Sequence, residues 1–357
     1  MKKMRICLAH EVASQNVYLH NMLVKEGKHT PYSIVFFSYK YHANNFEGKH
    51  CACKIRASQN IWLNRLYAGI KIIKNIFPIL RNDIFHFFGG CTLCTGWYDL
   101  FVLKKLLGKK IIIEFNGNEI RTIDGCKKQN PFYEFIPEQY ISANFQNKQT
   151  LHAKLQKMGH LVDAFIIPYW ELYEYVKDII PTEKIFFKPH LIHIPTKQKR
   201  EIYENTTNKI KILHCPSNTN IKGTSYIHQI MKELTTVVEY KELTGVPRNV
   251  VINEINKADI ILDQILLGDY GVFALEAMSM GKPVMCYLLD DVQKKYPPTL
   301  PIINVSIHTL KEKIVELHNN RKNIVELGKL SYEYVSTFHS EKNISSVYNA
   351  ILSKITS

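Results

Sequence analysis

The feature that most constrains the fold is an alternation of short, almost wholly apolar runs with segments long enough to form helices. The runs that we predict as strands are residues 4–9, 32–38, 84–88, 110–115 and 164–167 in the first half, and 211–215, 260–262, 283–287 and 301–304 in the second. Apolar strands separated by helices are typical of parallel sheets that are covered on both faces. Because 357 residues are many for one hydrophobic core, two domains of this kind are expected.

The polar stretch 196–209 interrupts this alternation, and we interpret it as the link between the domains. The prediction is an α/β chain of two doubly wound Rossmann-like domains, residues 1–195 and 196–340. The two domains are expected to face a cleft at the carboxyl ends of their strands, where such sheets bind ligands. Residues 341–357 are predicted to form a helix that packs back on the first domain.

The composition, with 46% hydrophobic and 22% charged residues, is that of an ordinary soluble domain. No apolar run is long enough for a membrane span, and the apolar stretch at residues 6–9 is too short for a signal peptide. These features predict a cytoplasmic protein.

The formal net charge of +14 is concentrated in the first half of the chain. Residues 1–190 carry 26 Lys and Arg against 15 Asp and Glu, whereas residues 191–357 carry 20 against 17. A basic half suits an anionic partner such as a membrane surface, a phospholipid-like acceptor or nucleic acid, and a solvated face without a partner is equally compatible. Nucleic acid is disfavoured because no basic stripe is interleaved with stacking aromatic residues.

Residues 61–81 depart from the general pattern because they combine many apolar residues with basic ones. The segment fits either a basic amphipathic helix on a membrane surface or a core-facing helix of the first domain. Its notable residues are Trp62, Arg65, Lys71, Lys74 and Arg81, and it is interrupted by Gly69 and Pro78.

The sequence does not favour a metal site. Eight cysteines over this length are not a disulfide framework, and Cys51, Cys53, Cys91 and Cys94 lack the spacing of a four-thiolate zinc site. The pair Asp290-Asp291 is interpreted as a solvated turn rather than a manganese site. No metal and no other cofactor is expected.

Two loops of the second half carry residues suited to a phosphate. The loop after residues 211–215 contains Ser217, Asn218, Lys222 and Gly223 before a helix begins. Small polar residues, a glycine and a lysine at such a junction supply free amides, a helix N-terminus and a cation.

The second loop follows the strand 260–262. It contains Gln264 and the run Gly268-Asp269-Tyr270-Gly271-Val272, after which a helix carries Glu276. A phosphate between Lys222 and the amides of residues 268–271, with the Glu276 carboxylate at sugar-hydroxyl distance, describes a nucleotide diphosphate site. The alternative for Glu276 is an ordinary amphipathic helix whose acid meets solvent or a nearby lysine.

The run ADIILDQILLGDYGVFALEAMSMGKPV, preceded by HCPSNTNIKGTSYI, resembles the retaining nucleotide-sugar glycosyltransferases of the GT-B fold, in particular family four with its E-x7-E and G-K-P-V motifs. In the first half, DIFHFFGG and DLFVLKKLLGKKIIIEFNGNEIR are similar to the N-terminal domain of bacterial cell-surface polysaccharide transferases.

The resemblance implies a role for each candidate residue. Glu276 would bind the ribose hydroxyls of a UDP- or GDP-sugar, and Lys222, with Gly223, Ser217 and Asn218, would hold the diphosphate. Gln264 and residues 268–272 would contact the sugar and the distal phosphate. The catalytic set would be Lys222 together with Asn116, Glu119 and Arg121. Same-face attack with retention would need no strong general base, and no metal is expected either.

Three positions depart from the family pattern. Gly268 stands where the first glutamate of E-x7-E is expected, and no arginine accompanies Lys222 in its loop. In the first-domain loop that often reads H-G-S-D-x-R, Asn116 replaces the histidine, so that this position cannot titrate. Contacts to the donor sugar should therefore differ, and less diphosphate charge should be neutralised.

The expected function is transfer of a sugar from a nucleotide-diphosphate donor to a glycan or lipid-linked acceptor in lipopolysaccharide, O-antigen or capsule synthesis, at the cytoplasmic face of the membrane. The alternative is a catalytically degenerate GT-B protein that binds nucleotide or glycan as a partner or scaffold. His10 and His86 could face the cleft, whereas His214 is predicted to be a satisfied core histidine.

Overall fold

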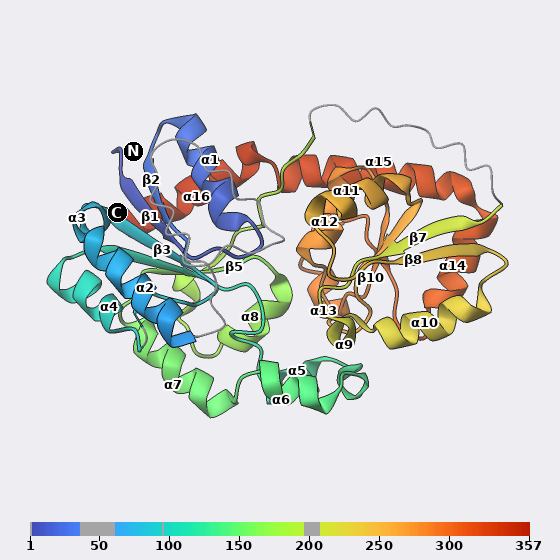
Figure 1. Ribbon diagram of the computed structural model, residues 1–357, viewed down its shortest axis with the longest axis horizontal. Helices are drawn as coiled ribbons and strands as arrows, with labels where there is room; N and C mark the ends of the chain where they lie inside the picture. Colours follow the sequence, from blue (N-terminus) through green and yellow to red (C-terminus); the bar gives the residue numbers. More distant parts are fainter. Residues whose placement is uncertain (1, 36–60, 95, 196–207) are drawn as a thin grey trace. The chain divides into compact units, whose positions relative to one another are not determined.

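The computed structural model describes residues 2–35, 61–94, 96–195 and 208–357, with side chains in helix α2 described from residue 66 onward. It groups the chain into two compact units (Figure 1). The first unit comprises Met1–Thr122, Gln146–Leu191 and Glu341–Ser357, and the second comprises Ile123–Phe145 and Ile192–Ser340.

The first unit is built on a six-stranded sheet in the order β2-β1-β3-β4-β5-β6, in which every neighbouring pair is parallel. Its strands are β1 (Arg5–Ala9), β2 (Thr30–Ile34), β3 (Ile84–Phe88), β4 (Lys110–Glu114), β5 (Ala164–Ile167) and β6 (Ile185–Phe187). β3 and β5 are buried throughout, and β1 and β4 are buried apart from their first residues, which explains their largely apolar sequences.

Helices cover both faces of this sheet. One face is covered by α1 and α16, which lie side by side (Figure 1). Their residues Leu19, Leu23 and Tyr348 share a core cluster with Leu8 and Ile112 of the sheet. The connections from β2 to β3 and from β3 to β4 run along the sheet in the direction opposite to the connection from β1 to β2. Because such connections are right-handed, α2–α4 lie on the face opposite to α1. The helical elements are α1 (Gln15–Glu26), α2 (Ile61–Lys74), α3 (Ile76–Leu80), α4 (Tyr98–Phe101), the π-helical turn η1 (Val102–Leu106), α7 (Lys148–Gly159), α8 (Trp170–Val176), η3 (Thr182–Lys184) and α16 (Glu341–Thr356).

The second unit has a five-stranded parallel sheet in the order β11-β10-β9-β7-β8. Its strands are β7 (Ile210–His214), β8 (Val238–Glu242), β9 (Ile260–Leu262), β10 (Val284–Cys286) and β11 (Ile303–Asn304). Its helical elements are α9 (Thr219–Lys222), α10 (Thr224–Glu233), α11 (Arg248–Lys257), α12 (Val272–Ser279), α13 (Asp290–Gln293), α14 (Leu310–Asn319), α15 (Arg321–Phe338), and α5 (Ile123–Gln129), η2 (Tyr133–Phe135) and α6 (Glu138–Asn144).

The segment 123–145 differs from the predicted division at residue 195, because it groups with the second unit. Phe132, Ile141 and Phe145 belong to the core that contains β7 and β9. The Asn130 Nδ2 donates a hydrogen bond of 2.6 Å to the Leu266 carbonyl, in the loop after β9. Nothing in the sequence pattern reveals this, because the segment lies between two strands of the first sheet.

The predicted fold class, two doubly wound parallel α/β domains, is confirmed by the two sheets. Two strands were not predicted, β6 and β8, and both lie at a sheet edge. In β8 exposed positions alternate with buried or half-buried ones, so VEYKE lacks an apolar run. The end of the predicted strand 32–38 and the linker 196–207 lie outside the described residues.

The segment 61–81 forms two helices, α2 and α3, separated at Asn75 rather than at Gly69. The Asn75 amide ends α2 by donating to Lys71 and Ile72 carbonyls. None of the helices in the described part of the chain is long and apolar enough to cross a membrane.

Candidate functional site

The first loop of the candidate site follows β7 and turns into α9. The Asn218 side chain caps this helix, accepting hydrogen bonds from the amides of Asn220 at 3.0 Å and Ile221 at 3.4 Å. Ser217 is exposed beside it. Gly223 ends α9 with a φ of +77°, and a Cβ there would lie 2.6 Å from Ile265 Cγ1, so this close turn requires glycine.

Lys222 is the last residue of α9, and its side chain is only 11% exposed. Its ammonium lies 2.5 Å from Asp263 Oδ1, at the carboxyl end of β9. The other oxygen, Asp263 Oδ2, accepts the Gly271 amide at 2.9 Å. One fully buried carboxylate therefore holds the lysine of the first loop beside the glycine of the second.

Gly271 is the residue that precedes α12. A Cβ at Gly271 would lie 3.4 Å from Lys222 Nζ, which places the ammonium against the amino end of the helix. The first amides of a helix have no partner within it, and its amino end carries partial positive charge. The predicted residues Lys222, Gly271 and Val272 are thus brought together, in a geometry that suits an anion.

Glu276 lies about one turn into α12, and its side chain is 18% exposed. Its Oε1 accepts two hydrogen bonds from Arg248, one from Nε at 3.0 Å and one from Nη2 at 2.7 Å. Arg248 opens α11 and is 35% exposed. Because α11 leads from the end of β8 back to the start of β9, its first residue lies at the carboxyl edge of the sheet.

Arg248 was not identified from the sequence. It is 28 positions from Glu276, and a lone arginine after Gly245-Val246-Pro247 has no local signature. The usable signal is positional, because helix starts in a doubly wound domain lie at the same edge as the ligand loops.

The second loop is stabilised by its own buried side chains, those of Gln264, Asp269 and Tyr270. Asp269 is 2% exposed and accepts the Tyr296 hydroxyl on both oxygens at 3.0 Å, and Gln264 donates to the Asp269 carbonyl. Tyr270 is also buried, and burial raises the pKa of its phenol. That Gln264, Asp269 and Tyr270 contact a donor sugar stays a prediction.

Gly268, at the position of the missing glutamate, has a φ of +87°. A Cβ there would lie 2.5 Å from Leu289 Cγ, and the Leu289 amide donates to the Gly268 carbonyl at 2.9 Å. The backbone of this loop therefore favours a residue without a side chain.

The first-unit candidates follow β4. The Asn116 amide donates to Glu119 Oε1. Arg121 is 8% exposed and donates to Glu171 through Nε at 3.0 Å and Nη2 at 2.9 Å, while its Nη1 donates to Asn118 at 3.0 Å. Although burial alone would lower the pKa of Arg121, the Glu171 carboxylate raises it. Glu171 was missed from the sequence, and the catalytic roles assigned to this loop stay predictions.

Three histidines of the sheets are buried or half-buried. His10 follows β1 and His214 ends β7, whereas His86 lies in the middle of β3 and not at its carboxyl end. The Nε2 of His10 lies 3.0 Å from the Thr92 carbonyl, and burial lowers the pKa of His10 to about 4. His214 is a satisfied core histidine, as predicted, with Nδ1 2.8 Å from the Leu262 carbonyl and Nε2 2.9 Å from Thr224 Oγ1.

His86 belongs to a buried charged cluster with Glu114 and Lys188. Glu114 Oε2 lies 3.2 Å from Lys188 Nζ and 3.2 Å from His86 Nε2, and all three side chains are at most 2% exposed. Burial alone would raise the pKa of Glu114, but Lys188 and His86 lower it to about 2. The cluster stabilises the carboxyl edge of the first sheet, where the Glu114 carbonyl also accepts the Gly89 amide at 2.8 Å.

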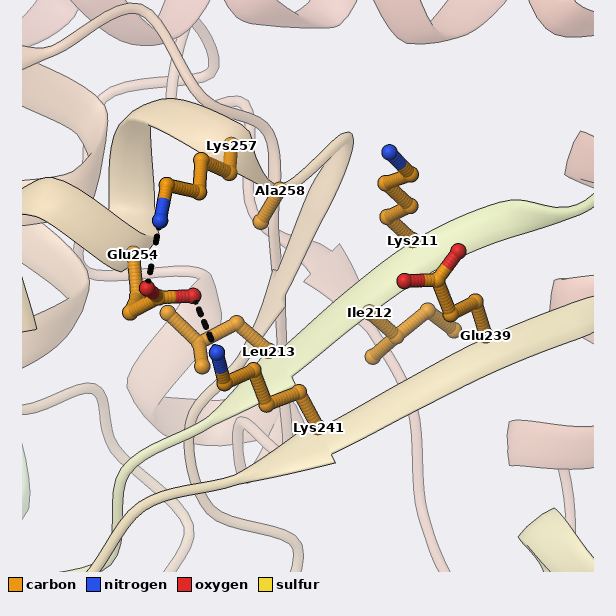
Figure 2. A pocket seen from close by; sticks show the side chains of 8 residues that line it. All are labelled: Lys211, Ile212, Leu213, Glu239, Lys241, Glu254, Lys257 and Ala258. Carbon is orange, nitrogen blue, oxygen red and sulfur yellow. Dashed lines mark hydrogen bonds and ion pairs between the residues drawn. The ribbon is translucent and has the colours of Figure 1, made fainter. Parts of the chain in front are cut away.

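Other polar groups in the described residues have local roles. Cys91 and Cys94 are exposed thiols, whereas Cys51 and Cys53 lie outside the described residues. Asp291 is exposed and pairs with Lys294 at 3.0 Å. Figure 2 shows a hollow between α11 and the strands β7 and β8, where Glu254 bonds Lys241 at 2.6 Å and Lys257 at 2.8 Å, near the opposite end of α11 from Arg248.

Neither known family models nor curated proteins match this sequence. Solved structures do. A sucrose-phosphate synthase from Thermosynechococcus elongatus is similar over 99% of both chains, with 12% identity and a TM-score of 0.68. HepE of Anabaena, solved with UDP and glucose, is similar over 98% of this chain and 99% of its own, with 10% identity and a TM-score of 0.63. WaaG, a glycosyltransferase involved in lipopolysaccharide biosynthesis, is similar over 97% and 99%, with 12% identity and a TM-score of 0.61.

These similarities, together with the two parallel sheets, show that the chain has the GT-B fold. At this level of identity they show the fold alone, and the chemistry has to be argued from the residues.

Proposed function

We propose that this protein is a glycosyltransferase that uses a nucleotide-diphosphate sugar as donor. The observation that carries the proposal is the position of Lys222 against the amino end of α12, with Glu276 farther along the same helix. A cation and a helix N-terminus suit the diphosphate, and a carboxylate beyond them suits ribose hydroxyls. The solved neighbour HepE, whose fold is similar over nearly the whole chain, was crystallised with UDP-glucose.

The role of Lys222 follows from its pairing. An ammonium has three donors, and the contact with Asp263 uses one of them. The remaining donors, with the first amides of α12, would stabilise charge that builds on the leaving diphosphate as the glycosidic bond breaks. We propose that this stabilisation, rather than a metal ion, assists departure, and that transfer proceeds with retention.

We further propose that the acceptor is a glycan or lipid-linked glycan of the cell surface, reached from the cytoplasmic face of the membrane. Support comes from exposed apolar side chains of the first unit on α2, α3, α4 and η1, which together we call its apolar surface. Phe77 is 76% exposed, Ile73 71%, Tyr98 78% and Leu106 68%.

This surface is also basic. Residues 61–81 contain four Lys and Arg and no acid, and in residues 98–110 four lysines accompany one acid, Asp99, which is buried. Exposed apolar side chains flanked by lysines suit a surface of anionic lipids. The fit to a membrane extends the prediction for residues 61–81 to α4 and η1.

Vesicle sedimentation tests the membrane surface. The protein should bind vesicles containing phosphatidylglycerol, lose binding as salt increases, and bind less as the double variant Ile73→Ser, Phe77→Ser. The matched control is Val325→Ser, Leu330→Ser, which removes two exposed apolar side chains from α15 of the second unit. An equal loss of vesicle binding in both double variants would contradict the assignment of the membrane surface to the first unit.

A thermal-shift screen with UDP, GDP and their sugars tests the donor site directly. A ligand at one hundred times its dissociation constant stabilises the folded state by about 2.7 kcal/mol, so a bound nucleotide should be visible. Absence of a shift with all of these compounds would oppose the proposal.

The second candidate is a GT-B protein that binds nucleotide without turnover. Two observations favour it: position 268 is a glycine, and the Arg121 side chain is hydrogen-bonded to Glu171. The two candidates differ in turnover. Release of UDP or GDP from the bound donor, alone or with a crude lipid acceptor fraction, supports the transferase, and binding without release supports the alternative.

A further inference from the structure

The Arg248–Glu276 pair has an asymmetry that points to a function. Two donors of the arginine, Nε and Nη2, bond the same carboxylate oxygen, Glu276 Oε1. Among the residues that the structure describes, Oε2 accepts no hydrogen bond from the protein. We propose that Arg248 is a positioning residue, which holds Oε1 so that Oε2 is presented to the ribose hydroxyls of the donor. This inference rests on the proposed function.

The need for a positioning residue follows from the surroundings of Glu276. On α12 the neighbouring residues Leu275 and Ala277 are fully buried, so the backbone of the helix is fixed by packing. The Glu276 side chain is at a partly exposed position and has several rotatable bonds, so the helix alone leaves its carboxylate free to reorient. Holding it in one orientation before the ligand arrives lowers the entropic cost of binding.

Arg248 is well suited to this task because its own position is fixed from another element. It is the first residue of α11, directly after Pro247, whose ring restricts the backbone, and the Pro247 carbonyl accepts the Val250 amide at 3.0 Å. A planar guanidinium fixes the direction of a carboxylate better than the point charge of a lysine. The pair therefore joins the starts of two helices at the carboxyl edge of the second sheet.

The opposite interpretation is that Arg248 occupies the ribose position and must leave before nucleotide binds. The geometry favours positioning, since one carboxylate oxygen remains available and both side chains are partly open to solvent. Removal of Arg248 should weaken nucleotide binding if the arginine positions Glu276, and strengthen it if the arginine competes with the ribose. The affinity of Arg248→Ala therefore distinguishes the two interpretations.

The test measures dissociation constants of UDP and GDP, and of their 2′,3′-dideoxy analogues, for the parent protein and Arg248→Ala. We expect Arg248→Ala to bind the ribonucleotide about fivefold to tenfold more weakly, as for the loss of about one net hydrogen bond. The dideoxy analogue, which lacks the hydroxyls that Glu276 would contact, should bind both proteins equally. Lys257→Ala, at the other end of α11, is the matched control and should change neither value.

Each other outcome overturns the inference. Equal or tighter ribonucleotide binding by Arg248→Ala means that the arginine is a spectator or a competitor. Equal weakening of the ribonucleotide and the dideoxy analogue means that Arg248 acts on the base or the phosphates. If the parent binds neither UDP nor GDP, the proposed function itself fails, which is distinguishable from failure of the positioning role alone. Arg248→Gln provides a second variant if alanine lowers the unfolding temperature.

Discussion

The two units each contain an Arg–Glu pair near the carboxyl edge of a parallel sheet, and the pairs differ in almost every physical respect. Arg121 and Glu171 have side-chain exposures of 10% and 3%, and the guanidinium bonds both carboxylate oxygens. Arg248 and Glu276 have exposures of 35% and 18%, and the guanidinium bonds one oxygen.

The difference shows how the same two residue types serve different purposes. A pair that is buried and fully bonded has no donor or acceptor left for a ligand, and removal of one partner leaves an uncompensated charge. A pair that is partly open to solvent contributes little to stability, and a carboxylate bonded through one oxygen can receive a ligand on the other. The first pair is therefore assigned to the fold and the second to the candidate site.

The largest expected effect is on folding, from Arg121→Ala. This variant leaves Glu171 buried without its partner, so we expect a loss of about 3 to 5 kcal/mol in the free energy of unfolding. Arg248→Ala, the matched change in the second unit, should cost less than about 1 kcal/mol. Urea titrations followed by circular dichroism measure both.

A similar cost for the two variants would remove the contrast between the pairs. If Arg121→Ala instead folds normally and loses only turnover, then the catalytic role that the sequence predicts for Arg121 is supported over the structural one.

The buried cluster around Glu114 should add a pH dependence to the first unit. Its carboxyl pKa of about 2 lies below the ordinary value of 4.5, so its contribution to stability is present above pH 4.5 and is lost as the pH falls towards 2. The shift corresponds to at most about 3 kcal/mol. Unfolding midpoints measured between pH 2 and pH 6 should show this loss.

Glu114→Gln is the control for that slope. It should be less stable at neutral pH, because Lys188 loses its buried partner, and its stability should change less between pH 4.5 and pH 2. An unchanged slope in this variant would mean that another group is responsible.

The strands that form the interiors of both sheets could be predicted from the sequence because they are apolar on both faces. The edge strands β6 and β8 could not, because an edge strand needs less burial and β8 alternates. The segment 123–145 was assigned to the wrong unit because its apolar residues would suit either core. Sequence patterns predict burial, but they do not predict which core provides it.

The candidate site shows the same limit. Lys222, Gly271 and Glu276 could be named as candidates because each follows a predicted strand, and parallel strands place their following loops at one edge. Their partners could not be found, since Arg248 and Glu276 are 28 positions apart and Arg121 and Glu171 are 50 apart. Ion pairs over such distances leave no periodic signal in a single sequence.

Glu276→Ala tests the open pair for binding. If Glu276 accepts hydrogen bonds from ribose hydroxyls, its loss removes charge-assisted bonds of about 1.5 to 3 kcal/mol and weakens UDP or GDP binding by roughly ten to one hundred and fifty fold. Isothermal titration gives the dissociation constants. Folding should be close to that of the parent.

Glu254→Ala is the matched control for that variant. Glu254 is also paired with basic residues of the second unit, Lys241 and Lys257, but near the far end of α11 (Figure 2). It should bind nucleotide normally. Normal binding by the Glu276 variant, or its failure to fold, would assign the Glu276 carboxylate to packing.

The last expected effect concerns Gly268, which stands where the resemblance to E-x7-E predicts a first glutamate. Its φ of +87° disfavours any side chain by about 1 to 2 kcal/mol, and a Cβ would also meet Leu289. Gly245→Ala is a matched control, since Gly245 has a φ of +68° with nothing within 4 Å of the added Cβ. Urea titrations should show both losses, with the larger one at position 268.

The comparison of these two glycine variants separates backbone strain from the contact with Leu289. If Gly268→Ala costs no more than Gly245→Ala, the loop can move away from Leu289, and an acid at position 268 becomes sterically possible. If Gly268→Ala costs more stability than Gly245→Ala and leaves nucleotide affinity unchanged, position 268 does not admit an acid. Glu276 would then be the one acid of the E-x7-E pattern that can contact the proposed donor. The Arg248–Glu276 pair would then be the proposed ribose contact, without a second acid at position 268.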